Sequence, residues 1–294
     1  MTGIIDAHHH IWRQADLPWL SGPMQPRIFG PYEPIRRDYP VSEFLDDIAE
    51  TGVTKSVYVQ ANWAPDRFED EVAWVQSQAD ERGWPHAIVG YADFLTEDVR
   101  PQLDRLRAYP LMRGVRMQLH WHENEMYRFA SRPDLCLDDT LQRNIAHLAD
   151  YGWAFDLQVF TGQMTGAAQL AMACPEVTFV LQHAGMLEDT SEAGRSAWHT
   201  GMAMLSSCPN VVSKLSAFGT FIHRNDVNHI AEIVIATVAL FGADRCLFGS
   251  NFPIEKLWTS YAELIEAHKT AAAPLQSAVQ RAIFHDNAQR VYRL

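Results

Sequence analysis

The feature that most constrains this chain is a regular alternation of short apolar segments with helix-like segments. Strand-like segments occupy 4–8, 55–61, 87–94, 114–120, 154–160, 178–183, 211–216 and 246–249. Helical patterns lie between them, among them 42–51 with a serine cap at its start, 68–82, 138–151 and 226–241, each followed by a glycine. Strands that alternate with helices are typical of parallel sheets. Eight such units with short connections predict an α/β protein with a closed (β/α)8, TIM-like barrel.

An open, doubly wound sheet is the competing architecture. Such a sheet normally carries a glycine-rich loop after its first strand, but this chain has Asp6-Ala7-His8-His9-His10 there. The sequence contains no GxGxxG, GxxxxGK or GxSxG motif. We therefore expect one barrel domain over 1–294. The Pro-rich and aromatic segment 13–40 should form a loop over the barrel mouth, and 274–294 a closing C-terminal helix.

Composition narrows the class of partner. The net charge of −12 argues against nucleic acid, because a phosphate backbone requires Lys and Arg side chains. No apolar run approaches membrane-spanning length, and the four cysteines are spread without a CxxC pair. These features predict a soluble, cytoplasmic protein with reduced thiols and a small-molecule substrate. A homodimer is the candidate assembly.

The histidines of the first strand are the strongest indication of function. In an extended strand, His8 and His10 point to one side and His9 points to the other. Two imidazoles on one side can bind one ion or one substrate oxygen. We expect His9 to be a packing residue.

Polar residues follow the other predicted strands as well. In a barrel of this kind the reactive groups lie at the carboxyl ends of the strands. Polar side chains gathered on the rim of an apolar barrel are costly unless something binds there. Along the chain, the strand ends supply His8 and His10, Gln60 and Asn62, Asp93, Arg116 with Gln118, His120 and His122, Gln158, His183, Lys214 with Ser216, and Asn251.

Some of these residues have two readings. Arg116 could brace the barrel through a carboxylate, or it could bind an anionic group or a polarised carbonyl. His183 is either a functional imidazole or a core one, and the residue pattern favours function. His120 and His122 are expected to be loop residues that tune specificity. Trp12 lies close in sequence to the histidine pair.

Five segments together resemble a known family. They are Ile5-Asp6-Ala7-His8-His9-His10-Ile11-Trp12, Arg113-Gly114-Val115-Arg116, Val180-Leu181-Gln182-His183-Ala184-Gly185, Lys214-Leu215-Ser216 and Phe248-Gly249-Ser250-Asn251-Phe252-Pro253. In this order they resemble the amidohydrolase superfamily, and within it the lactonase branch of sugar-lactone and pyrone-dicarboxylate lactonases. The resemblance spans nearly the whole chain.

The resemblance implies a barrel of metal-dependent-hydrolase topology that hydrolyses a cyclic ester. His8, His10 and His183 would then surround the reacting carbonyl, with or without a divalent metal. Three neutral imidazoles suit Zn²⁺, so the same three residues are the candidate ligands if a metal is bound. Asn251 would be the fourth catalytic position. The candidate substrate contacts are Arg116, Lys214, Gln60, Gln118 and Trp12.

The chain departs from the family pattern at Asn251. The family has Asp in this position, where it activates water, and an amide cannot accept a proton near neutral pH. Three explanations for the missing base remain open. A water bound to a metal could need no strong base, or another acid such as Glu255 or Asp93 could act as the base in its place. In the third, the chain has lost hydrolysis. The predicted function is therefore a lactonase. A metal-dependent decarboxylase and a non-catalytic binding protein are the alternatives.

Overall fold

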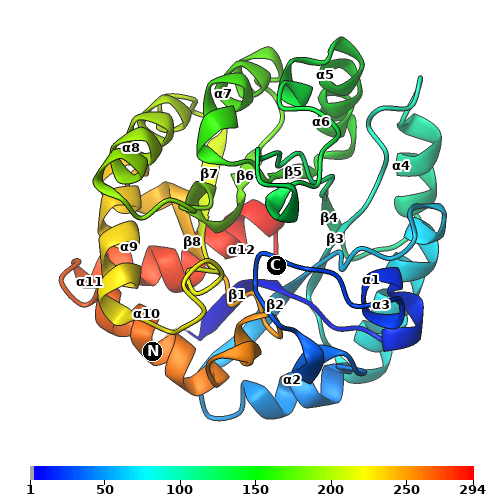
Figure 1. Cartoon of the computed structure of the whole chain (residues 1–294). Coiled ribbons are helices and arrows are strands. Elements are labelled where there is room, and N and C mark those ends of the chain that lie inside the picture. The colour runs from blue at the N-terminus through cyan, green and yellow to red at the C-terminus, as the bar shows by residue number, and fades with distance from the viewer. Residues whose placement is uncertain (1–2) are drawn as a thin grey trace.

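The computed structural model describes residues 3–294, which form an eight-stranded parallel barrel surrounded by helices (Figure 1). Each strand pairs with the next in chain order. The barrel closes where the backbone N–H of Asn251 donates to His8 O at 2.7 Å and that of His10 donates to Phe252 O at 2.7 Å. The strands are β1 (Ile4–His9), β2 (Val53–Val59), β3 (Ala87–Gly90), β4 (Met112–Val115), β5 (Ala154–Leu157), β6 (Phe179–Leu181), β7 (Val211–Leu215) and β8 (Cys246–Phe248). The predicted (β/α)8 barrel is confirmed.

Helices surround the barrel, and local sequence sets their ends. α3 has three acidic residues in its first turn, where their negative charges interact favourably with the positive end of the helix dipole. The helix is terminated by Gly83, whose φ of 75° lies in the left-handed region. Asp226 caps α9 by accepting from two backbone N–H groups. The helices are α1 (Pro18–Ser21), α2 (Val41–Asp47), α3 (Phe68–Arg82), α4 (Arg100–Leu106), α5 (Asp139–Ala146), α6 (Leu148–Tyr151), α7 (Met164–Ala173), α8 (Glu192–Ser206), α9 (Val227–Phe241), α10 (Tyr261–Ala272), α11 (Ser277–Arg281) and α12 (Asn287–Tyr292).

The barrel interior changes from apolar to polar along the strands. Near the strand starts, buried side chains such as Ala154 and Val212 form a small apolar core. Two residues further along, the same faces carry Asp156 and Lys214, because strand side chains repeat with a period of two. These two residues are fully buried and form an ion pair of 2.7 Å. Beyond them, polar residues reach the barrel mouth.

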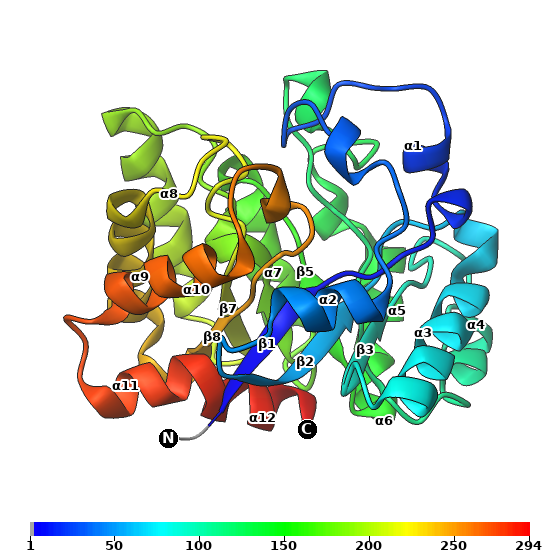
Figure 2. The same ribbon diagram turned by 90° about the horizontal axis from the view of Figure 1, so that it is seen from below.

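The C-terminal segment closes the end of the barrel where the strands begin. Figure 2 shows α11 and α12 at this end and the segment around α1 at the opposite end. Tyr292, on α12, inserts into the interior and donates a hydrogen bond of 3.1 Å to Asp156. The predicted single helix over 274–294 is instead two α-helices joined by a π-helical turn at Ala282–Asp286.

Several element boundaries differ from the sequence prediction. All strands except β1 end earlier than predicted, because their parallel pairing stops before the mouth: β3 ends at Gly90, and Gln118, His120 and Gln158 follow their strands. The predicted helix over 138–151 is divided into α5 and α6 at His147. α2 begins at Val41, so Ser42 lies inside its first turn instead of capping it.

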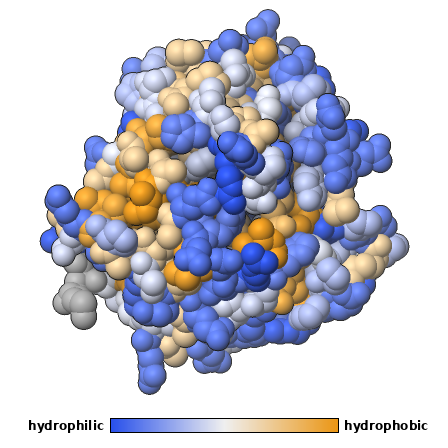
Figure 3. Space-filling view, turned by 60° about the vertical axis from the view of Figure 1, so that its left-hand side comes forward, coloured by the Kyte–Doolittle hydropathy of each residue, from blue (hydrophilic) through white to orange (hydrophobic). Residues whose placement is uncertain are grey.

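The outer surface is mainly hydrophilic. Figure 3 views the side on which α8, α9 and α10 lie and shows apolar patches between hydrophilic residues. Met204 on α8 and Ile235 on α9 are among the exposed large apolar side chains. Within residues 3–294, no helix combines the length and the apolar character needed to cross a membrane.

Candidate active site

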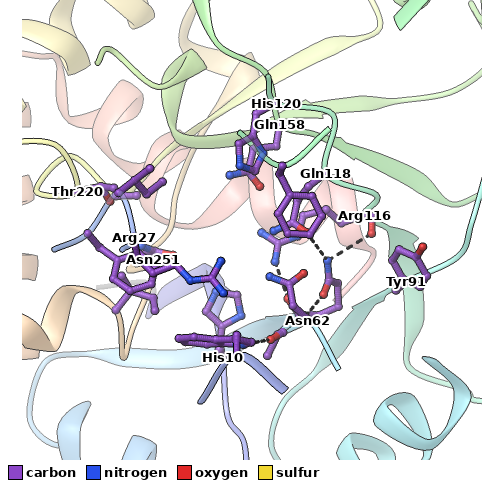
Figure 4. Close-up of a pocket in the computed structure, with 18 of the residues that line it drawn as sticks. His10, Arg27, Asn62, Tyr91, Arg116, Gln118, His120, Gln158, Thr220 and Asn251 are labelled. Atoms are coloured by element: carbon purple, nitrogen blue, oxygen red, sulfur yellow. Dashed lines mark hydrogen bonds between the residues drawn. The ribbon is translucent and has the colours of Figure 1, made fainter. Parts of the chain in front are cut away.

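A cavity of about 370 Å³ opens at the carboxyl ends of the strands. Figure 4 shows its polar side chains around a common space, with Asn251 and Thr220 on one side and Arg116 and Gln118 on the opposite side. Aromatic side chains make up much of the remaining lining. The polar members include His10, Gln60, Asn62, Arg116, Gln118, His120, Gln158, His183, Thr220 and Asn251, and the aromatic members include Trp12, Trp19, Phe29, Trp63, Tyr127, Phe129 and Phe221.

Three histidines from β1 and the end of β6 meet at this cavity. The ring centroid of His8 lies 5.1 Å from that of His10 and 4.8 Å from that of His183. His10 and His183 line the cavity, while His8 is fully buried between them. The structure therefore brings the three predicted imidazoles together. His9 points the other way and stacks on Phe44 at 3.9 Å, which confirms its packing role.

The surroundings keep these imidazoles neutral. Burial lowers the pKa of each ring well below its usual value of 6.5. The positive charge of Arg116 lowers all three pKa values further, and that of Lys214 lowers those of His8 and His183. A neutral imidazole has one N–H donor and one lone pair, so each ring can donate one hydrogen bond and accept another.

Neighbouring groups orient two of the rings. His10 donates its Nδ1–H to the carbonyl oxygen of Val59 at 2.7 Å, which leaves a lone pair on Nε2. His183 Nδ1 lies 2.8 Å from the Ser216 hydroxyl. The backbone of His183 has φ 55° and ψ 36°, in the left-handed region that L-residues rarely adopt. The fold thus holds this side chain in place at a cost in backbone strain, as is common at functional sites.

Arg116 is buried beside the imidazoles. Its Nη2 donates a 2.5 Å hydrogen bond to the carbonyl oxygen of Gln60, and burial lowers its pKa to about 10, so the guanidinium stays charged at neutral pH. Across the described chain, its buried Nε–H has no hydrogen-bond partner. Arg116 also lines the cavity, where its guanidinium can donate to a substrate oxygen. Arg116 therefore braces the end of β2 through a backbone carbonyl and not, within the described residues, through a carboxylate, and its place in the cavity lining is compatible with substrate binding.

Lys214 occupies a different position from the other predicted substrate contacts. Its side chain is 0% exposed, below the cavity, and pairs with Asp156. Gln182 also donates to Asp156 at 3.0 Å. These contacts favour a structural and electrostatic role for Lys214, because its ammonium group is already paired.

The remaining predicted contacts do line the cavity. Gln60, Gln118 and Trp12 all contribute to the lining. The Trp12 ring lies 6.4 Å from the His10 ring, and its Nε1–H donates to the carbonyl oxygen of Arg37 in the loop over the mouth. Asp93, one of the two acids considered as a substitute base, accepts instead from the Leu95 N–H in its own turn.

Asn251 connects the end of β8 to the histidines. Its backbone has φ 57°, a left-handed conformation that Asn tolerates better than most residues. Its amide lies beside both His10 and Glu255, where it raises the pKa of His10 and lowers that of Glu255. Of the two acids proposed from the sequence, the structure thus places Glu255 beside Asn251.

The three imidazoles have the chemistry of zinc ligands, and within the described residues the His8 ring nitrogens have no hydrogen-bond partner. In that same part of the chain, however, no group of three or more His, Cys, Asp or Glu side chains is placed to hold a metal ion. Two positive charges, on Arg116 and Lys214, also lie near the rings. The observed arrangement therefore does not fit the predicted three-histidine metal site, and we assign no chemical step to a metal.

Sequence reasoning missed several lining residues. Trp19, Arg27 and Phe29 come from the segment predicted to fold over the mouth, but their individual positions had no signal in the sequence. Thr220 follows β7 in an irregular segment. Glu71 lies in the first turn of α3, where acidic residues are common because they stabilise a helix start. The sequence therefore did not mark it as a site residue.

Comparison with known proteins gives a consistent result. The family profile described as Amidohydrolase matches residues 5–294. The chain belongs to the amidohydrolase family. It is 34% identical to the uncharacterised protein y4mH of Sinorhizobium fredii over 99% of this chain and 98% of that protein. It is 27% identical to an L-fucono-1,5-lactonase of Burkholderia multivorans over 99% and 96% of the two chains.

A solved structure supports the same assignment. A Burkholderia multivorans amidohydrolase with bound zinc superposes on this amidohydrolase with a TM-score of 0.82 and 26% identity, covering 99% of each chain. The resemblance to the lactonase branch of amidohydrolases is confirmed, and the family membership makes this protein a hydrolase.

Proposed function

We propose that this amidohydrolase opens a small lactone by adding water to its carbonyl group. The observation that carries the proposal is the convergence of His10, His183 and the Arg116 guanidinium on one cavity. The similarity to an L-fucono-1,5-lactonase supports a cyclic ester as the substrate class. A sugar-acid lactone and a lactone from aromatic catabolism both fit a cavity of about 370 Å³.

The proposed roles follow from charge and hydrogen-bonding capacity. The Arg116 guanidinium donates to the carbonyl oxygen or to a neighbouring carboxylate of the substrate. When Ser216 donates to His183 Nδ1, the neutral ring carries its proton on Nε2. This Nε2–H then donates a hydrogen bond to the same carbonyl oxygen. Such preorganised donors in a dry site stabilise the oxyanion that forms when water adds, by an amount on the order of several kcal/mol.

The other contacts orient the reactants. The amides of Gln60 and Gln118 bind hydroxyl or carbonyl groups of the substrate, and the Trp12 ring packs against its apolar face. Asn251 orients the attacking water next to His10. The carbon–oxygen bond of the ring then breaks, and the product is an open-chain hydroxy acid, which releases a proton at neutral pH.

The test is a lactone panel followed with a pH indicator. Purified protein is incubated with aldonolactones and with unsaturated carboxylated lactones, with and without added Zn²⁺. We expect acid release with at least one lactone, and a loss of about 100-fold or more in kcat/KM for His183→Gln. The matched control is His199→Gln, because His199 is exposed on α8. Absence of acid release across the whole panel, in both metal conditions, would count against a lactonase. Release of CO₂ from aromatic acids by the same preparation would favour the decarboxylase alternative.

A further inference from the structure

The site lacks a carboxylate at 251, but a carboxyl group lies one helical turn later. The N–H groups of Ile254 and Glu255 both point back to Asn251 O, at 3.0 and 3.4 Å. This turn carries the Glu255 side chain back beside the Asn251 amide. Glu255 is 3% exposed, so its carboxyl group is held inside the protein.

Four neutral groups surround the Glu255 carboxyl. Trp258 Nε1–H donates to Oε2 at 2.9 Å, and the Thr220 hydroxyl donates to Oε1 at 3.4 Å. The Gly219 backbone and the Asn251 amide also lie beside the carboxyl group, and both lower its pKa. A Cβ at position 219 would lie 2.6 Å from Glu255 Oε2, so the absence of a side chain at Gly219 allows this close approach. The carboxyl group is thus held by a specific set of donors.

Two of these partners connect Glu255 to the cavity. Thr220 and Asn251 both line the cavity, and Glu255 lies behind them. A hydroxyl group can accept a proton on its oxygen while it donates its own. An amide N–H can only donate to a carboxylate, so the neighbouring Glu255 favours the orientation in which the NH₂ group of Asn251 faces it.

We propose that Glu255 is a positioning residue for the hydrolysis, which holds, through Thr220, the proton that the attacking water gives up. The inference rests on the proposed lactonase function. As the water oxygen bonds to the carbonyl carbon, its proton passes to Thr220 Oγ, and the Thr220 proton passes to Glu255 Oε1. When the ring carbon–oxygen bond breaks, the reverse transfer gives the proton to the departing ring oxygen. Water is consumed and a hydroxy acid is formed, so Glu255 ends in its starting state.

The protonation behaviour of Glu255 suits this role. Burial, with no compensating cation among the four partners named above, raises its pKa from 4.5 to about 7. A group that acts as a proton acceptor and donor is most effective when its pKa lies near the working pH. Glu71 has a similar pKa of about 7 and also lines the cavity, but its Oε1 accepts from Tyr58 and from the Ala61 N–H, on the β2 side of the barrel.

The experiment measures kcat and KM against pH, from 5.5 to 9, with a lactone that the wild-type enzyme hydrolyses. We expect the wild-type kcat to rise as Glu255 ionises near pH 7. Glu255→Gln should lower kcat by about 100-fold or more, remove the rise near pH 7 and leave KM little changed. Thr220→Val should lower kcat in the same way, while Thr220→Ser, which keeps the hydroxyl, should retain most of it.

The matched control is Glu188→Gln. Glu188 is a partly buried carboxyl group that accepts from Thr161 Oγ1 at 3.4 Å, the same distance as the Thr220 contact, and burial raises its pKa as well. The Glu188→Gln variant should retain the wild-type pH profile. If Glu255→Gln does not fold, the comparison of Thr220→Val with Thr220→Ser decides the proposal, since both keep the carboxyl group.

The outcomes separate the two proposals. An active wild-type enzyme whose Glu255→Gln variant keeps both its rate and its pH profile overturns the role of Glu255 and leaves the lactonase intact. The same holds if Glu71→Gln, and not Glu255→Gln, removes the rise near pH 7. A wild-type enzyme without activity on any lactone overturns both proposals.

Discussion

Lys214 offers the sharpest test of how the interior is built. The structure shows a fully buried ion pair between its Nζ and Asp156 Oδ2 at 2.7 Å, with Tyr292 and Gln182 completing the hydrogen bonds of the carboxylate. Removing one member of such a pair leaves an uncompensated buried charge, which costs about 3–5 kcal/mol. That is a large share of the roughly 5–15 kcal/mol that stabilises a typical domain.

We therefore expect Asp156→Asn to lower the free energy of unfolding by about 3–5 kcal/mol, because Lys214 would be buried without its charged partner. Lys214→Met should cost a similar amount unless Asp156 takes up a proton. Combining the two substitutions should cost less than the two single losses added together, because both charges are then absent. The assay is reversible urea unfolding, followed by circular dichroism and by tryptophan fluorescence.

The reasoning would be refuted by single variants within about 1 kcal/mol of the wild type, since surface-like substitutions have effects of that size. A Lys214→Met variant that unfolds like the wild type but has a much higher KM for lactone would instead show that Lys214 contacts the substrate. The two readings of Lys214 thus differ in which measurement changes.

Two further predictions concern the cavity. Arg116→Met should lower kcat/KM by roughly 10- to 150-fold, because a hydrogen bond to a charged group contributes about 1.5–3 kcal/mol, and steady-state kinetics with an unchanged kcat/KM would contradict this. Glu71 should make the free energy of unfolding depend on pH. Burial raises its pKa in the folded state from 4.5 to about 7. Its contribution to stability, about 3 kcal/mol, is therefore complete below pH 4.5 and is lost as the pH rises through about 7. Urea midpoints between pH 4.5 and 8 should therefore fall less in Glu71→Gln than in the wild type, and parallel curves for the two proteins would argue against this origin.

Local patterns were enough to predict the architecture and the first two histidines. The strand-and-helix alternation predicted eight units, and the structure forms eight parallel strands in chain order. The period of two along β1 placed His8 and His10 on one side and His9 on the other, as their ring contacts show. Both patterns depend on nearest neighbours in the chain and on burial, which a sequence records directly.

The same patterns did not separate Lys214, which lies within β7, from Arg116, which follows β4. The side chain of Lys214 lies one layer below the cavity because Asp156, on a different strand, is there to pair with it. Nor could the sequence distinguish Glu255 from Asp93 as the acid beside Asn251. That choice depends on the turn after β8, on the close approach at Gly219 and on Thr220, which lies 35 residues away from Glu255 in the chain.

From its sequence alone, this protein was predicted to be a barrel with histidines at its mouth and, at position 251, an amide where the resemblance implies an acid. The tertiary structure decided which charges are paired, which donors remain free and which carboxyl group lies behind the amide. The physical reason is that strand and helix periodicity is a local property of the chain, whereas burial and hydrogen-bond pairing arise only when distant segments come together.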